Sequence, residues 1–199
     1  MGSHTRLRQD LIDAALECFS SYGVRKTQLS DVAQRAGVSR ATAYRAFAAK
    51  PDLIAAVVES EIARFIDGYR QAVDLTAAAD TVLRDTMPFV LEWVRNHPVL
   101  ARVLADEPEQ FLELLVQEGD RLTAIDVMRP AAEVGLSQAD PRQLRATPVQ
   151  VAEWSVRILL SFILIPRTTL NDVDQIADLC VYGVWHPQDS VDSERGRQS

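Results

Sequence analysis

Along most of the chain, apolar residues recur at steps of three and four, which is the spacing of one face of an α-helix. The first such run ends at Gly23, where a left-handed residue commonly terminates a helix. It consists of Leu7, Leu11, Ile12, Ala15, Leu16, Phe19 and Tyr22. A second helix is predicted to stop at Gly37, with Thr27 or Ser30 as its N-cap and Asp31 in its first turn.

The remaining pattern also predicts helices, punctuated by prolines and polar turns. Their expected bounds are Ser39, as N-cap, to about Phe47; Pro51 to Tyr69; Asp80 to Asn96, kinked at Pro88; a short helix after Pro98; Glu109 to about Val134; Thr147 to Ile165; and Asp172 to about Trp185, capped by Asn171. Gly135 to Pro148 is predicted to be a loop, and residues 188–199 a polar tail. Since no stretch alternates in the manner of a β-strand, the predicted fold class is all-α.

Composition agrees with a packed helical chain and narrows its chemistry. Of the 199 residues, 47% are hydrophobic, while glycine and proline number only 8 and 9. The two cysteines and three histidines are scattered, so we expect no disulfide framework, metal or cofactor, and a reducing cytoplasm fits. Residues 1–4 look like an expression-vector remnant, and no signal peptide is expected after them. Polar residues interrupt the most apolar stretch, Val149 to Ile165, which favours a buried helix over a membrane span.

The charge is distributed unevenly along the chain. The formal net charge is −7, yet residues 1–53 hold eight Lys/Arg and five Asp/Glu, so they carry +3 and leave −10 on the remainder. A basic first segment on an acidic body indicates that only this segment meets a polyanion.

Helix, glycine-containing turn and short helix in succession form the helix-turn-helix pattern. On the short helix, Ala43 and Phe47 are four residues apart and are expected to face inward with Val38. The outward side is then expected to present Arg40, Ala41, Thr42, Tyr44 and Arg45. Because the N–H groups at a helix N-terminus favour anions, the start of this helix at Ser39 suits a phosphate.

The outward residue types match the chemistry of duplex DNA. Arg40 suits a guanine edge or a phosphate, Ala41 suits a thymine methyl group, and Thr42 is short enough for close approach. Tyr44 and Lys50 suit phosphate oxygens, which position a protein without reading sequence.

Several of these residues also have plainer readings. A solvated helix face is the alternative for the whole group. Arg45 stands between a phosphate contact and a surface salt bridge. Arg25 and Lys26 either flank the DNA or complement the negative end of the first helix.

The segment TQLSDVAQRAGVSRATAYRAFAAKPDLIAAVV, Thr27 to Val58, resembles the DNA-binding region of the TetR-type (tetracycline-repressor-like) transcriptional regulators, and the preceding AALECFSSYGVRKT continues the likeness. The positions that match the recurring family pattern are Val32, Ala33, Ala36, Gly37, Val38, Ser39, Thr42, Tyr44, Phe47, Lys50 and Leu53. The chain departs from the pattern at Ala43, where a bulky apolar residue is usual, and at Pro51, where an acid is usual. Ala43 implies a thinner core under the recognition helix.

The resemblance implies an all-α homodimer with about nine helices per subunit. The last two helices of each subunit would form an intersubunit four-helix bundle, and the middle helices would enclose an effector pocket. The expected domains are residues 5–50, which bind DNA, and residues 51–187, which bind the effector and dimerise. The expected function is a cytoplasmic repressor that a small hydrophobic or amphipathic effector releases from a pseudo-palindromic operator. A helical protein-interaction module that does not bind DNA is the alternative, and no enzyme motif is present.

Three sets of site residues are expected on these grounds. The DNA-binding set is Thr27, Ser39, Arg40, Ala41, Thr42, Tyr44, Arg45 and Lys50. The effector-pocket set, for which core packing is the alternative, is Phe89, Trp93, Phe111, Leu115, Trp154 and Phe162. The dimer set is Arg157, Leu160, Leu164, Ile176, Leu179 and Val184. Glu153 and Arg157, four residues apart, form either a surface-type pair or a contact with the effector or the second subunit.

Overall fold

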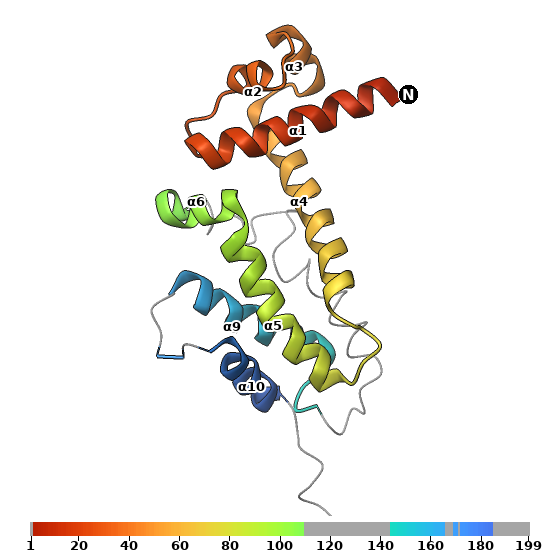
Figure 1. Ribbon diagram of the computed structural model, residues 1–199, viewed down its shortest axis with the longest axis vertical. Helices are drawn as coiled ribbons and strands as arrows, with labels where there is room; N and C mark the ends of the chain where they lie inside the picture. The colour runs from red at the N-terminus through yellow and green to blue at the C-terminus, as the bar shows by residue number, and fades with distance from the viewer. Residues whose placement is uncertain (1, 110–143, 166–168, 171, 185–199) are drawn as a thin grey trace, which may run out of the picture. The chain divides into compact units, whose positions relative to one another are not determined.

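The computed structural model describes residues 2–109, 144–165, 169–170 and 172–184 and confirms the all-α fold (Figure 1). These residues form eight helices: α1 (Gly2–Tyr22), α2 (Leu29–Arg35), α3 (Arg40–Ala46), α4 (Lys50–Ala72), α5 (Ala79–Asn96), α6 (Pro98–Asp106), α9 (Pro148–Leu164) and α10 (Val173–Val184). The helix predicted from Glu109 to Val134, most of the predicted loop before Pro148, the Asn171 cap and the polar tail lie outside the described residues.

The chain packs as two compact units. The first comprises residues 1–68 and 94–114, and the second comprises residues 69–93 and 115–199. Helices α1, α2, α3 and α6 belong to the first unit and α9 and α10 to the second, while α4 and α5 contribute residues to both. The domain boundary expected after residue 50 divides the DNA-binding residues from those that bind the effector and dimerise, whereas the two units are defined by packing. The expected boundary stays a prediction.

The first unit is built on α1, whose apolar stripe is buried as its spacing predicts. Helix α2 packs against α1, and α3 packs against α2 (Figure 1). The side chains buried among them include Leu11, Ala15, Phe19, Val32, Ala33, Ala43 and Phe47. Burying a phenylalanine contributes about 1.5–3 kcal/mol, so Phe19 and Phe47 are the main anchors of this core.

Two glycines end α1 and α2 in the left-handed conformation that the sequence predicts. Gly23 has φ +85° and Gly37 has φ +68°. An L-residue with a side chain rarely adopts this conformation, whereas glycine does so without steric cost.

The N-cap of α2 is Gln28, so the prediction of Thr27 or Ser30 was wrong. The Gln28 backbone N–H donates to the Asp31 carboxylate at 2.8 Å, as in a capping box. Thr27 is 1% exposed, and its hydroxyl donates to the Gly23 carbonyl at 2.8 Å, so it serves the preceding turn instead. Ser39 caps α3 as predicted, because its Oγ accepts the Thr42 backbone N–H at 3.1 Å.

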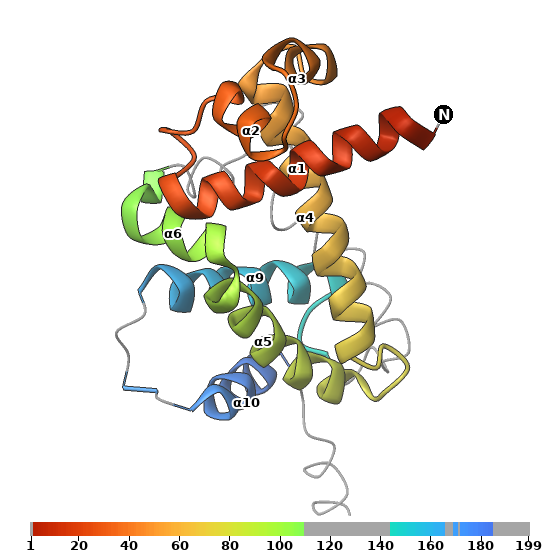
Figure 2. The same cartoon turned by 45° about the horizontal axis from the view of Figure 1, so that its top comes forward.

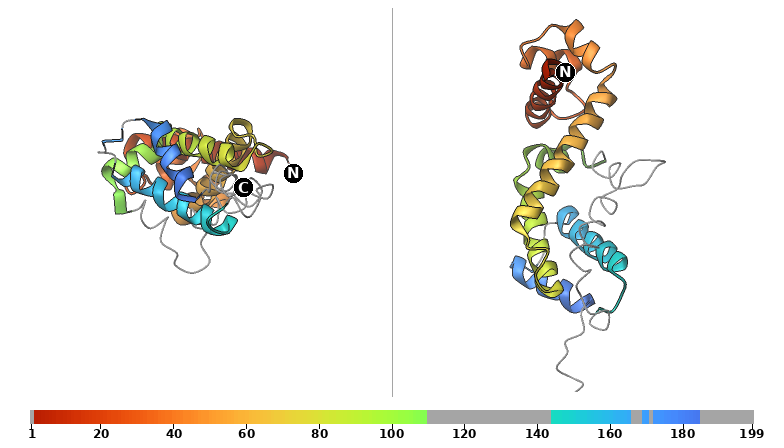
Figure 3. Two further views of the ribbon diagram at one scale, coloured as in Figure 1. Left: turned by 90° about the horizontal axis from the view of Figure 1, so that it is seen from below. Right: turned by 90° about the vertical axis from the view of Figure 1, so that its right-hand side faces the viewer.

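The second unit packs α10 against α9 (Figure 3). One buried cluster joins Leu83 of α5 to Val151 of α9 and to Val181 and Val184 of α10. A second cluster groups Tyr69, Val73 and Val82, and the hydroxyls of Tyr69 and Thr86 lie 2.8 Å apart. Among the helices that the structure describes, none has both the length and the apolar character that a membrane crossing requires.

Candidate nucleic-acid interface

The outer face of α3 presents the side chains that the helical phase predicts. Arg40, Ala41, Tyr44 and Arg45 are exposed, and the Tyr44 side chain is 53% exposed despite its size. Figure 2 shows α3 at one end of the group that α1, α2 and α3 form. The helix therefore offers two cations and an aromatic hydroxyl on one accessible surface.

Three polar side chains on this face are linked to one another. The Ser39 and Thr42 hydroxyl oxygens lie 2.8 Å apart. Arg45 donates from Nη2 to Thr42 Oγ1 at 3.3 Å and from Nε to the Ala41 carbonyl at 3.3 Å. These bonds hold the Arg45 guanidinium along the helix, and they leave the Thr42 hydroxyl already engaged.

Ala43 gives the inner face of α3 a smaller apolar contact than a bulky residue at this position would. Ala43 and Phe47 are fully buried as predicted, but Val38, which was expected in the core, is only half-buried. Arg8 of α1 compensates, because its guanidinium carbon lies 4.2 Å from the centroid of the Phe47 ring and its Nη1 donates to the Ala46 carbonyl. The sequence pattern did not single out Arg8, since nothing along α1 marks which helix end it reaches.

Two residues of the expected DNA-binding set contact the turn after α1. Thr27 is buried, and Lys50 is half-buried with its Nζ donating to the Arg25 carbonyl at 2.9 Å. Desolvation lowers the pKa of Lys50, and the charge of Glu107 acts against that shift. Both side chains hold the turn between α1 and α2.

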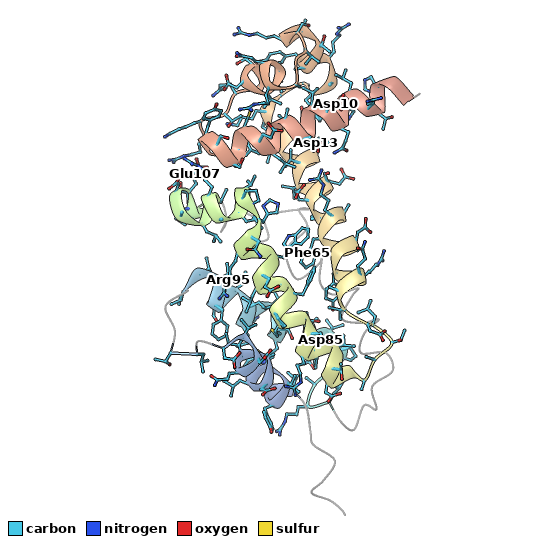
Figure 4. All side chains as sticks on the ribbon, in the orientation of Figure 1. Asp10, Asp13, Phe65, Asp85, Arg95 and Glu107 are labelled. Carbon is cyan, nitrogen blue, oxygen red and sulfur yellow. The ribbon has the colours of Figure 1, made fainter. Side chains whose placement is uncertain are left out.

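A buried carboxylate from a distant part of the sequence reaches the same turn. Glu107, the C-cap residue of α6, is 4% exposed, and both of its carboxylate oxygens lie 3.3 Å from the Arg25 backbone nitrogen, which donates to them. Figure 4 labels Glu107 between the ends of α6 and α1. The Arg25 side chain pairs instead with Glu109 at 3.2 Å, where both groups are exposed. No signal in the sequence points to the role of Glu107.

The expected effector-pocket set is only partly gathered by the described residues. Phe89 lies between Tyr69 and Trp93, with ring centroids 5.6 and 6.0 Å away and the ring planes tilted by 59° and 33°. Phe162 is half-buried, Trp154 is exposed, and positions 111 and 115 fall outside the described residues. Within the described ranges, no three His, Cys, Asp or Glu residues are grouped so that they would hold a metal ion.

The expected dimer set divides into outward and inward residues. Arg157, Leu164 and Leu179 are exposed and Leu160 is half-buried. The remaining two, Ile176 and Val184, are buried within the chain itself. The Arg157 and Glu153 side chains pair with each other at 2.6 Å, as the plainer reading of this spacing predicts.

Comparison with known proteins places the helix-turn-helix segment in a family. Residues 11–57 match the family model described as bacterial regulatory proteins, tetR family. The uncharacterized HTH-type transcriptional regulator TtgW of Pseudomonas putida is 30% identical over 112 residues, which cover 56% of this chain and 74% of TtgW. The HTH-type transcriptional activator FasR of Mycolicibacterium smegmatis is 29% identical over 89 residues, or 45% of this chain, and the match spans only 41% of FasR.

Solved structures share the fold over most of the chain. SmeT, the repressor of the Stenotrophomonas maltophilia multidrug efflux pump SmeDEF, has a TM-score of 0.60 at 21% identity and 91% coverage of each chain. A SmeT–triclosan complex has a TM-score of 0.59 at 18% identity, covering 92% of this chain and 93% of SmeT. The matched relatives are transcriptional regulators, in agreement with the expectation that the chain is not an enzyme. The helix-turn-helix geometry and these matches together show that the chain belongs to the TetR family of bacterial regulatory proteins.

Proposed function

We propose that the chain is a transcriptional repressor that binds a pseudo-palindromic DNA duplex as a homodimer and is released by a small hydrophobic or amphipathic effector. The observation that carries the proposal is the outer face of α3, where Arg40 in the first turn and Tyr44 and Arg45 in the last turn are exposed. This face belongs to the +3 segment of an otherwise acidic chain. A major groove admits one α-helix, and arginine bound to guanine is the commonest specific contact there.

We assign a different DNA contact to each exposed residue of α3. Arg40, in the first turn of α3, is assigned to a guanine edge or a phosphate, and Ala41 to a thymine methyl group. Tyr44 and Arg45, in the last turn of α3, are assigned to phosphate oxygens, and the helix N-terminus at Ser39 is assigned to a further phosphate. Thr42 permits close approach because its side chain is short. Its hydroxyl is already bonded to Ser39 and Arg45.

A homodimer is supported by apolar side chains on the outside of the last two described helices. Trp154 and Leu164 of α9 are exposed, and Leu179 and Tyr182 of α10 are 55% and 69% exposed. A surface with several large apolar residues is typical of a protein–protein contact. We therefore assign Leu164 and Leu179 to the interface and move Trp154 to it from the expected pocket.

The assignment to a dimer is tested by placing a charge on the proposed interface. Leu179→Glu is expected to shift the protein from dimer to monomer in sedimentation velocity, because it buries an unpaired carboxylate. Thr81→Glu, which adds the same charge at an exposed position of α5, is the control and is expected to sediment like the wild type. A Leu179→Glu protein that remains fully dimeric removes this helix face from the interface.

A small apolar effector is supported by the adjacent aromatic rings of Tyr69, Phe89 and Trp93 in the second unit. Ligand pockets are mostly apolar and aromatic, with few polar groups. The related fold of SmeT has been solved with triclosan. We propose repression because SmeT, which shares the fold, is a repressor. Another relative, FasR, is an activator.

The DNA-binding proposal is tested by selecting duplexes from a random-sequence pool with the purified protein. Selection should enrich a pseudo-palindrome whose half-sites face the two copies of α3, and affinity should fall steeply as salt rises. Arg40→Ala and Tyr44→Ala should weaken binding to the selected duplex while the fold stays intact. Arg70→Ala removes an exposed charge from the last turn of α4 and should have little effect.

The same measurements separate DNA binding from the alternative function. A helical interaction module without DNA binding would enrich no motif and would bind selected and scrambled duplexes equally. Equal binding at moderate salt would therefore reject the proposed function.

A further inference from the structure

The Glu107 carboxylate sits in a place where a charge is costly to bury. A buried carboxylate is tolerated only where hydrogen bonds and opposite charges replace its water. Here the replacement comes from the Arg25 backbone N–H, bonded to both oxygens at 3.3 Å, and from the attraction of the Lys50 ammonium. The carboxylate therefore has a specific attachment to the turn that follows α1.

The turn itself is shaped to receive this carboxylate. A Cβ atom added to Gly23 would lie 2.6 Å from Glu107 Oε1, which is closer than two such atoms can approach. A residue with a side chain at this position would thus displace the carboxylate, in addition to resisting φ +85°. Gly37, the other glycine with positive φ, has no atom within 4 Å of its added Cβ.

The two peptide groups that flank Arg25 in the turn are each held by a different helix. Glu107, at the end of α6, accepts from the Arg25 N–H, while Lys50, at the start of α4, donates to the Arg25 carbonyl at 2.9 Å. Arg25 precedes the helix-turn-helix in sequence and Lys50 follows it. This bracket of Glu107, Arg25 and Lys50 therefore fixes the entry and the exit of the segment that contains α2 and α3.

We propose that Glu107 is a positioning residue for DNA binding, which holds the recognition helix in its binding orientation by fixing the Arg25 turn and, through it, Lys50. The inference rests on the proposed function of α3. The inference predicts a change in DNA affinity opposite to the change that charge alone would cause. Removing the negative charge of Glu107 from the DNA-binding unit should tighten binding to a polyanion. Removing a positioning group should instead weaken that binding.

The test compares two neighbouring glutamates that differ in burial. Glu107→Ala is expected to weaken binding to the duplex selected by the wild-type protein about 10- to 150-fold, the range expected from losing one hydrogen bond to a charged group. Glu109→Ala removes an equal charge from an exposed side chain that pairs only with the Arg25 side chain among the bonds described. It is expected to leave affinity unchanged or to raise it. Unchanged or tighter binding by folded Glu107→Ala would overturn the proposal.

Two further measurements keep the result decisive. Hydrogen exchange of the Arg25 amide should be slow in the wild type and in Glu109→Ala and faster in both Glu107→Ala and Glu107→Gln, because the amide loses its carboxylate acceptor. If Glu107→Ala does not fold, Glu107→Gln replaces it, and weaker binding with a faster Arg25 amide is the supporting result. Val151→Ala, which destabilises the buried core of the second unit, should bind the duplex normally, which separates positioning from a general loss of stability.

Failure of the inference differs from failure of the proposed function. If the wild-type protein enriches no duplex, the proposed function fails and the inference fails with it. If the wild type binds a selected duplex and folded Glu107→Ala or Glu107→Gln binds it equally well, only the positioning role is rejected.

Discussion

Replacing Gly23 with alanine should destabilise the protein far more than the same change at Gly37. Both glycines have positive φ, at +85° and +68°, so each substitution imposes the same kind of backbone strain. Only Gly23 has a neighbour in the way, because its added Cβ would lie 2.6 Å from Glu107 Oε1. The pair therefore isolates the contribution of the buried carboxylate.

The magnitude follows from these two effects. The left-handed conformation costs a residue with a side chain about 1–2 kcal/mol. Displacing Glu107 also removes the Arg25 N–H from a charged acceptor, worth about 1.5–3 kcal/mol. Gly23→Ala should therefore lower the free energy of unfolding by about 2.5–5 kcal/mol, and Gly37→Ala by about 1–2 kcal/mol.

Urea unfolding followed by circular dichroism measures both values, at one fixed protein concentration because the stability of the proposed homodimer depends on concentration. A double-mutant cycle gives the cause: in a Glu107→Ala background the obstacle is gone, so Gly23→Ala should cost only about 1–2 kcal/mol. Equal losses of stability for Gly23→Ala and Gly37→Ala in the wild-type background would refute the reasoning.

Three other changes have defined outcomes. Ser39→Ala removes the N-cap of α3 and should lower the free energy of unfolding by about 1 kcal/mol in urea; no loss would mean that the cap is idle. Tyr69→Phe removes the hydroxyl that lies 2.8 Å from the Thr86 hydroxyl and should cost about 1 kcal/mol without opening a cavity, whereas a neutral or stabilising result would deny that bond any value. Burial raises the pKa of the Cys180 thiol to about 11, from 9.0, so the unfolded chain ionises first. The stability that this thiol contributes is complete below pH 9 and is lost as pH rises from 9 to 11, by about 2–3 kcal/mol. A Cys180→Ala variant that shows the same decline would contradict this assignment.

The helices were predictable because their information is local. Apolar spacing places α1, and the two glycines mark where α1 and α2 end, as the structure confirms. The N-cap of α2 was missed for a tertiary reason. Thr27 has a suitable side chain, but burial commits its hydroxyl to Gly23, which leaves Gln28 and Asp31 to form the cap.

The candidate site was predictable only where one helix contains it. The phase of α3 gave its exposed and buried faces correctly, except at half-buried Val38. The supporting contacts of Arg8 and Glu107 were not predictable, because each joins residues far apart in the sequence, 38 and 82 positions in these two cases. The bond from Lys50 to the Arg25 carbonyl was not predictable for the same reason, and the assignment of Lys50 to a phosphate stays a prediction.

The way α3 is held has a consequence for how operator preference evolves. A helix of seven residues does not persist alone in water, so α3 depends on Ser39 at one end, Arg8 at the other and the buried Ala43 and Phe47 beneath. Of these four, only Ser39 lies on the outer face, where it bonds to Thr42. Substitutions at Arg40, Ala41 and Tyr44 on that face can therefore change the recognition sequence while the contacts that hold α3 stay in place.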